Sequence, residues 1–135
     1  MIAQSSPGDA LGKLVLRLSV GGLMLFHGVA KIMHAEALGK IGERLTGAGL
    51  PSQIAYGVYL GEVLAPILVI LGLFCRLGGA LMAVNMLVAI GLVHMADLAK
   101  LTGHGGWALE LQGLFLFGSV AIMLLGSGRF AIRPD

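Results

Sequence analysis

Residues 14–33 form an apolar stretch of 20 residues, LVLRLSVGGLMLFHGVAKIM. At a rise of 1.5 Å per residue, a helix of this length covers about 30 Å, the thickness of the hydrocarbon core of a bilayer. Backbone can cross that layer only if its own hydrogen bonds are satisfied, as they are in a helix. The stretch therefore predicts a membrane-spanning helix around which the rest of the chain must fold.

Three further apolar stretches occur at about residues 54–74, 77–96 and 107–125. The chain is 57% hydrophobic and 12% charged, whereas about a quarter of the residues in a soluble domain are charged. Its 135 residues suit a single domain, and its 22 glycines suit helices that pack closely in lipid. We predict an all-α integral membrane protein, with one domain over residues 1–135 folded as an antiparallel four-helix bundle. The glycines also make a homo-oligomer plausible.

Several other classes of protein are disfavoured. The net charge is +2, but the nine basic residues are scattered over the expected helix ends and form no patch, which argues against nucleic-acid binding. Cys75 is the single cysteine, so the chain offers no intrachain disulfide or cysteine cluster. It has no HExxH motif, P-loop, dinucleotide fingerprint, serine nucleophile elbow or CxxCH motif. We therefore predict no metal site from ligand spacing.

The first apolar stretch contains three basic side chains. At about 100° per residue, Arg17, His27 and Lys31 lie within an arc of roughly 80° and form one stripe. Arg17 and Lys31 lie near the two ends, where long side chains can reach the interface, and we interpret Arg17 as such an anchor. His27 lies about 9 Å from the nearer end, so it needs a polar partner within the protein.

The next two stretches also contain polar residues. Glu62 is the only formal charge of the second stretch, and Pro66 removes the helical hydrogen bond to its carbonyl group. A kink beside a buried acid indicates a cavity, although a protonated Glu62 could instead hydrogen-bond a neighbouring helix. In the third stretch, Asn85 predicts an interhelical hydrogen bond. His94 follows nine residues later, so an α-helix would place the two on opposite faces and only one of them in a given pocket.

Between the first two spans, residues 35–45 predict a short amphipathic helix at the membrane interface, with Leu38, Ile41 and Leu45 on one side. Four spans place both termini on one side of the membrane. That side has five basic residues and the other has four, which favours cytoplasmic termini. The first set is Lys13, Arg17, Arg76, Arg129 and Arg133, and the second is Lys31, Lys40, Arg44 and Lys100.

In this antiparallel arrangement, five polar residues share the outer half of the bundle and predict a pocket that opens outward. Glu62 and His27 are the candidate catalytic residues, because they could exchange protons with a bound quinone headgroup. Lys31 and His94 are candidate ligand-binding groups that would orient the headgroup or neutralise its charge, and Glu110 would complete the polar wall. Histidines with carboxylates could also bind a metal ion, but the close ligand spacing of known motifs is missing.

The sequence resembles the DoxX family of small four-helix bacterial membrane proteins over almost its whole length. The similar segments are LRLSVGGLMLFHGVAKI, GEVLAPILVILGLFCRLGGALMAVNMLVAIGLVH, GGWALEL and GSGRF. The specific elements are the HG-x-x-K motif at His27, Gly28 and Lys31, the acid Glu62, the turn residue Arg76, His94 and the closing Gly-x-Gly-Arg pattern. Pro66 departs from the family, which often has glycine there.

The resemblance implies a protein of the bacterial inner membrane. The family's namesake resembles a subunit of a thiosulfate:quinone oxidoreductase, and other members look like partners in thiol and oxidative-stress complexes. It therefore implies a membrane subunit of a redox system that binds quinone or another small molecule and works with a soluble redox partner. The alternative is a non-catalytic scaffold that docks a soluble partner through residues 35–45. A transporter is disfavoured, because four spans leave little room for two alternating gates.

Overall fold

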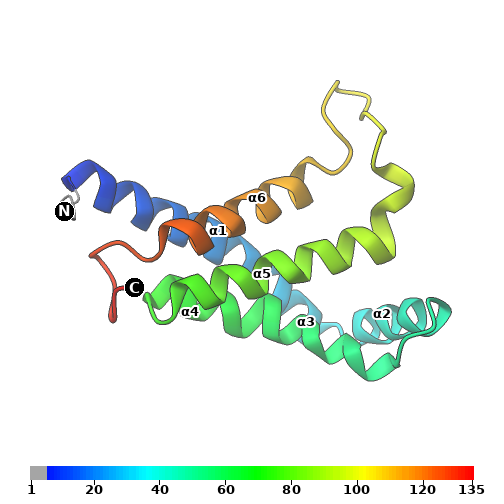
Figure 1. Cartoon of the computed structure of the whole chain (residues 1–135). Coiled ribbons are helices and arrows are strands. Elements are labelled where there is room, and N and C mark those ends of the chain that lie inside the picture. The colour runs from blue at the N-terminus through cyan, green and yellow to red at the C-terminus, as the bar shows by residue number, and fades with distance from the viewer. Residues whose placement is uncertain (1–5) are drawn as a thin grey trace.

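The computed structural model describes residues 6–135, and this part of the chain is helical with no β-strand. The predicted all-α class is confirmed. Figure 1 shows that the long helices run alongside one another and that both chain ends lie at the same end of the molecule. The α-helices are α1 (Pro7–Met33), α2 (Glu36–Gly47), α3 (Gly57–Tyr59), α4 (Ala65–Leu71), α5 (Cys75–Ala89) and α6 (Glu110–Leu125). Four shorter turns connect or extend them: the 3-10 turns η1 (Ser52–Tyr56) and η4 (Met95–Asp97), and the π-helical turns η2 (Leu60–Leu64) and η3 (Ile90–His94).

Three continuous helical stretches are long and apolar enough to cross a membrane: Pro7–Met33, Ser52–Leu71 and Cys75–Asp97. α1 starts earlier than the predicted span, because Pro7 occupies its first turn and the Ser6 hydroxyl accepts a hydrogen bond from the Asp9 amide. The fourth apolar helix, α6, has only 16 residues. It starts at Glu110, since the preceding residues form a loop in which the Trp107 indole donates to the Leu98 carbonyl.

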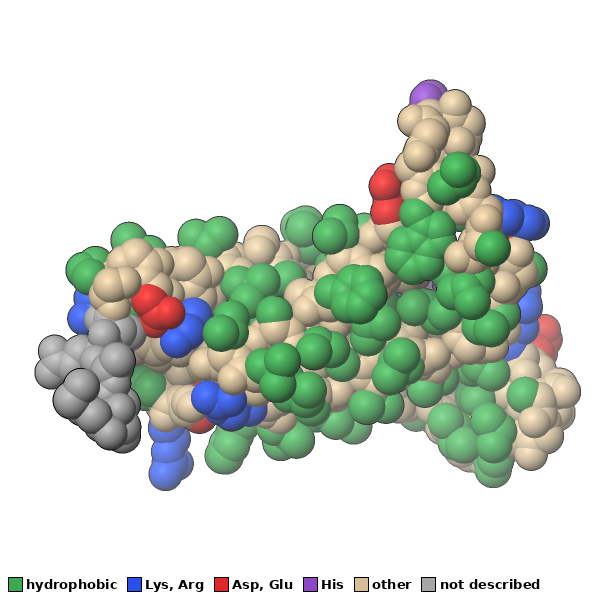
Figure 2. Space-filling view, turned by 45° about the horizontal axis from the view of Figure 1, so that its top comes forward, with side chains coloured by type: hydrophobic (Ala, Val, Ile, Leu, Met, Phe, Trp, Pro, Cys, Tyr) green, Lys and Arg blue, Asp and Glu red, His purple; other side chains and the backbone are tan. Residues whose placement is uncertain are grey.

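The helices pack around one apolar core. α1 contacts α4 and α6, and α5 contacts the same two helices. Met24, Val69, Met82 and Ile122 are fully buried where they meet. Large apolar side chains also cover the outside of the helices, as Figure 2 shows, and Phe26 is 74% exposed. Apolar side chains on both the inner and the outer helix faces are expected of a protein that is surrounded by lipid.

Arg17 is not an interfacial anchor, and that prediction was wrong. Its side chain is only 1% exposed. The guanidinium donates hydrogen bonds to the carbonyl groups of Val69 and Ile70 at 2.9 and 3.0 Å, and to those of Ser127 and Phe130 in the C-terminal segment. The last carbonyl groups of a helix have no intrahelical donor, and the five N–H groups of an arginine can satisfy several of them. Arg17 therefore joins α1, the end of α4 and the C-terminal segment.

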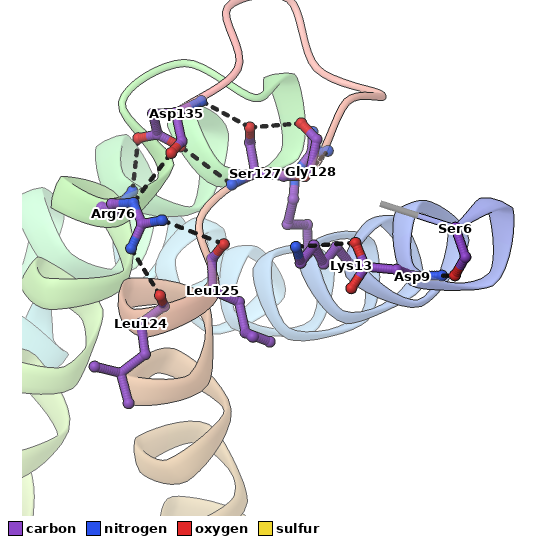
Figure 3. A network of polar contacts seen from close by, with 10 residues as sticks. Ser6, Asp9, Lys13, Arg76, Leu124, Leu125, Ser127, Gly128 and Asp135 are labelled. Atoms are coloured by element: carbon purple, nitrogen blue, oxygen red, sulfur yellow. Dashed lines mark hydrogen bonds and ion pairs between the residues drawn. The ribbon is translucent and has the colours of Figure 1, made fainter. Parts of the chain in front are cut away.

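A second arginine closes the same end of the molecule (Figure 3). Arg76 donates to the Leu124 carbonyl at 2.7 Å near the end of α6, and to the Asp135 carbonyl at 3.1 Å. The Asp135 carboxylate accepts from the backbone amides of Arg76 and Ser127. This end of the helices is thus tied together by backbone and side-chain hydrogen bonds.

The predicted amphipathic helix between the first two spans is present as α2. Leu45 is 1% exposed, Leu38 and Ile41 are half-buried, and Glu43 and Arg44 are exposed. α2 packs against η1 and contacts the end of α1 and η3. It therefore covers the end of the helices opposite to the chain termini (Figure 1).

Candidate functional site

A cavity of about 540 Å³ lies beneath α2, between α1, η2, α5, η3 and α6. Lys31 lies 14 residues after Arg17 on α1, so the cavity is roughly 20 Å along the helix from the arginine cluster. Most of its wall is apolar, with Met24, Leu81 and Phe115 among the lining residues. The polar lining residues are His27, Lys31, Lys40, Glu62, Asn85, His94 and Gln112.

Glu62 links three helices at the wall of this cavity. Its side chain is 4% exposed, and its Oε1 lies 2.5 Å from Lys31 Nζ on α1. Its Oε2 accepts a hydrogen bond of 2.8 Å from Asn85 Nδ2 on α5. The interhelical hydrogen bond predicted for Asn85 is present. A carboxylate with an ammonium on one oxygen and an amide on the other is the arrangement that stabilises a charged acid away from water.

The local backbone explains the position of Glu62. η2 is a π-helical turn, in which the Ala65 amide donates to the Leu60 carbonyl five residues earlier. Pro66 has no N–H to donate to the Glu62 carbonyl. α1 approaches this carbonyl so closely that a Cβ on Gly28 would overlap it. The absent side chain at Gly28 therefore allows α1 to pack on the widened turn.

A second glycine allows α5 to approach in the same way. A Cβ on Gly61 would lie 2.5 Å from Asn85 Cβ, closer than real Cβ atoms come. The Asn85 amide can therefore reach the neighbouring Glu62 carboxylate only because residue 61 has no side chain.

His27 lines the cavity from α1 and is exposed in the isolated chain. Its ring meets the edge of Phe115 on α6 at a centroid distance of 5.4 Å and an angle of 85°. No other described residue forms a hydrogen bond with its imidazole. The structure thus brings His27 and Glu62 to the same cavity and leaves the His27 nitrogens available to a bound molecule.

Asn85 and His94 line the same cavity, so the prediction that they face opposite sides was wrong. The reason is η3, the π-helical turn from Ile90 to His94. A π-turn takes up one more residue than an α-turn. Nine residues then advance the helix by about the angle of eight α-helical residues, which leaves roughly 80° between the two side chains.

Glu110 is the predicted site residue that the structure does not bring to the cavity. It is exposed at the start of α6, and its carboxylate lies beside Gly106 in the preceding loop. Gln112 and Phe115, further along α6, line the cavity instead.

Three further polar residues line the cavity although the sequence predicts no site role for them: Lys40, Asn85 and Gln112. For Lys40, the sequence does contain a signal. This residue is adjacent to Ile41, which lies on the apolar side of the helix predicted over residues 35–45 and so faces the rest of the protein.

The sequence profile of the DoxX family matches residues 12–95, a region that includes Lys31, Glu62 and Asn85. The chain belongs to the DoxX family. This DoxX protein is 32% identical over 124 residues to the Bacillus subtilis (strain 168) protein named "Putative oxidoreductase CatD", a match that covers 92% of the chain and 86% of that relative. No solved structure is significantly similar to it.

Proposed function

We propose that this DoxX protein is the membrane subunit of a redox system and that its cavity binds the headgroup of a quinone. The observation that carries the proposal is an apolar cavity with a buried Glu62 carboxylate, paired with Lys31, in its wall, and with His27 beside it. The name of the Bacillus subtilis relative supports redox chemistry.

The lining residues fit a quinone ring. The ring is flat and largely apolar and carries two carbonyl acceptors, so it needs apolar walls and a few hydrogen-bond donors. Met24, Leu81 and Phe115 provide apolar wall, and His27, His94 and Gln112 provide donors. The volume of about 540 Å³ falls within the usual range of small-molecule sites, about 300–1,000 Å³.

Reduction of a quinone to a quinol consumes two electrons and two protons. The electrons would come from a soluble redox protein, and the groups of this chain would handle the protons. His27 is the side chain that can donate a proton directly to the ligand, and the Lys31–Glu62 pair can hold another. His94 would orient the ring from η3. Glu110 lies away from the cavity and has no role in this proposal.

We also propose that α6 crosses the membrane as the fourth span of an antiparallel bundle. Its 16 residues rise about 24 Å, and the preceding Trp107 would lie at the interface, where tryptophan is enriched. The protein would reside in the bacterial inner membrane with cytoplasmic termini, and the cavity would open outward beneath α2.

Solvent extraction tests the proposed ligand. The full-length protein is purified in mild detergent, extracted with organic solvent and analysed by mass spectrometry for bound quinone. A matched pair of variants locates the site: Ala89→Phe fills the cavity, because Ala89 lines it, and Ala30→Phe adds the same ring on the exposed side of α1, outside the lining. We expect stoichiometric quinone in the wild type and Ala30→Phe, and much less in Ala89→Phe. Absence of quinone from all three, followed by no binding of added quinone, would contradict the proposal.

A second candidate function is a non-catalytic scaffold for a soluble partner. The exposed charged side of α2, with Glu43 and Arg44, favours it. In that case, charge reversal at these two residues would abolish co-purification of the partner, and changes at Glu62 would affect stability alone.

A further inference from the structure

We propose that the cavity selects an aromatic ligand that carries a negative charge at its outer end, and that Lys40 on α2 is the residue that recognises this charge. The proposal rests on the proposed quinone site, to which it adds charge specificity.

The charges around the cavity are unequal. Its charged lining residues are Lys31, Lys40 and Glu62. Lys31 and Glu62 neutralise each other as an ion pair, and the Asn85 amide is engaged with the same carboxylate. Lys40 forms no ion pair with any described residue. The wall that a ligand meets therefore has an excess positive charge.

The acidic neighbours of Lys40 are directed elsewhere. Glu36, one turn earlier on α2, has its carboxylate 3.9 Å from His34 Nδ1. Glu43, three residues later, lines a separate groove between α2 and η1 together with Gly39 and Ser52. The other titratable groups at the cavity are His27 and His94, which add positive charge when they are protonated.

α2 holds Lys40 at the rim of the cavity. Ala37 and Ile41, on the same side of the helix, also line the cavity, and the buried Leu45 fixes the next turn. A ligand with its ring against Phe115 and its polar end toward α2 would thus meet an ammonium group at that end. A carboxylate or sulfonate there would be attracted, whereas an ammonium substituent would be repelled.

Two naphthoquinones of different charge test this proposal: neutral 1,4-naphthoquinone and the anionic 1,4-naphthoquinone-2-sulfonate. Their dissociation constants are measured with the full-length protein in nanodiscs of zwitterionic phosphatidylcholine, with empty nanodiscs as the blank. The variants are Lys40→Ala and Lys40→Glu. Arg44→Glu is the matched control, because it reverses a charge on the exposed side of α2 outside the cavity lining.

We expect the wild type to bind the sulfonate more tightly than the neutral ring. Lys40→Ala should weaken sulfonate binding about fivefold, as for one ion pair at a partly exposed site, and Lys40→Glu should weaken it about tenfold or more. Neither Lys40 variant should change the dissociation constant of the neutral ring by more than about twofold. Arg44→Glu should change the dissociation constants of both rings by no more than about twofold.

Other outcomes would separate this proposal from the proposed quinone site. If the neutral ring binds and Lys40→Glu leaves the sulfonate affinity unchanged, the role of Lys40 is wrong and the quinone site stands. If neither ring binds to the wild type, both proposals are wrong.

Discussion

Gly28 on α1 packs directly on the carbonyl oxygen of Glu62, so closely that the two positions leave no room for a Cβ. This contact brings α1 against the π-helical turn η2 at the level of the cavity. Three residues further along α1, Lys31 reaches the carboxylate of the same Glu62. The backbone contact and the ion pair therefore depend on one helix crossing.

Gly28→Ala should break this crossing. The new methyl group would overlap the Glu62 carbonyl, and relief of such an overlap in a packed core costs about 1–3 kcal/mol. We expect this loss in the free energy of unfolding, measured by SDS titration of mixed micelles, together with weaker quinone binding. Gly22→Ala is the matched control, because a Cβ at this position of α1 meets no atom within 4 Å. Equal stability of the two variants would show that α1 can shift without cost.

The parts of the fold that depend on hydrophobicity could be predicted from the sequence. Long apolar stretches require helices in lipid, and the structure has three such helices at the expected places. The buried acid Glu62 required polar partners because an isolated charge in an apolar environment is costly. An interhelical hydrogen bond could also be predicted for Asn85, but Glu62 could not be identified as its partner. The depth in the membrane of Lys31, the ion-pair partner of Glu62, could be predicted, but the rotation of α1 that directs Lys31 at Glu62 could not.

The parts that depend on local helix geometry could not be predicted. The angle between Asn85 and His94 differs from the predicted one because η3 contains an extra residue in its turn. No residue pattern in the sequence predicts that π-turn. Arg17 lay at an anchor position by depth, but the carbonyl groups that it binds, at the end of α4 and in the C-terminal segment, only come together once the chain is folded. Glu110 lay at the right depth as well, yet the start of α6 directs it to the loop.

Arg17→Lys tests the buried arginine. The donors of a planar guanidinium lie on three nitrogen atoms, whereas a lysine has three donors on one atom. A lysine therefore cannot reach the carbonyl groups of both Val69 and Ser127. Loss of these hydrogen bonds, with a buried ammonium in their place, should lower the free energy of unfolding by about 3–5 kcal/mol. Limited proteolysis should also cut the C-terminal segment after residue 126 faster. Arg129→Lys is the control, because Arg129 is exposed and lies over the Phe130 ring, and it should cost less than about 1 kcal/mol. Similar effects of the two variants would contradict the role of Arg17.

A double-mutant cycle on Lys31 and Glu62 should be asymmetric. Lys31→Met leaves the Glu62 carboxylate, 4% exposed, without its counter-charge, which should cost about 3–5 kcal/mol. Glu62→Gln leaves Lys31, whose side chain is 24% exposed and can reach water, so it should cost less.

The double variant Lys31→Met/Glu62→Gln should recover much of the stability, because the glutamine side chain at position 62 would still accept the Asn85 hydrogen bond and no charge is left unpaired. It should not recover quinone reduction with the redox partner, since the proton-holding pair is gone. Lys13→Met is the control, because it leaves the Asp9 carboxylate, which is 40% exposed and can reach water, and it should cost less than about 1 kcal/mol. Additive losses in the cycle would argue against the ion pair, and a fully active double variant would argue against its role in proton transfer.

The π-turn η3 can be tested by changing the number of residues in it. Deletion of Gly91, where a Cβ meets no atom within 4 Å, should convert η3 to an α-turn and keep about 80° between Asn85 and His94, because His94 then follows Asn85 by eight α-helical residues. Insertion of one alanine after Gly91 should instead rotate His94 by about 100° out of the cavity. The loop after Asp97 would absorb either change in the length of the helix. We expect the insertion and His94→Ala each to weaken binding of 1,4-naphthoquinone about fivefold, as for the loss of one hydrogen bond. The two changes combined should weaken it no further, because both remove the same contact. Deletion of Gly91, and insertion of one alanine after Ala99 in the exposed segment beyond the helix, should leave the dissociation constant unchanged. If the deletion weakens binding as much as the insertion does, the extra residue of the π-turn does not set the direction of His94.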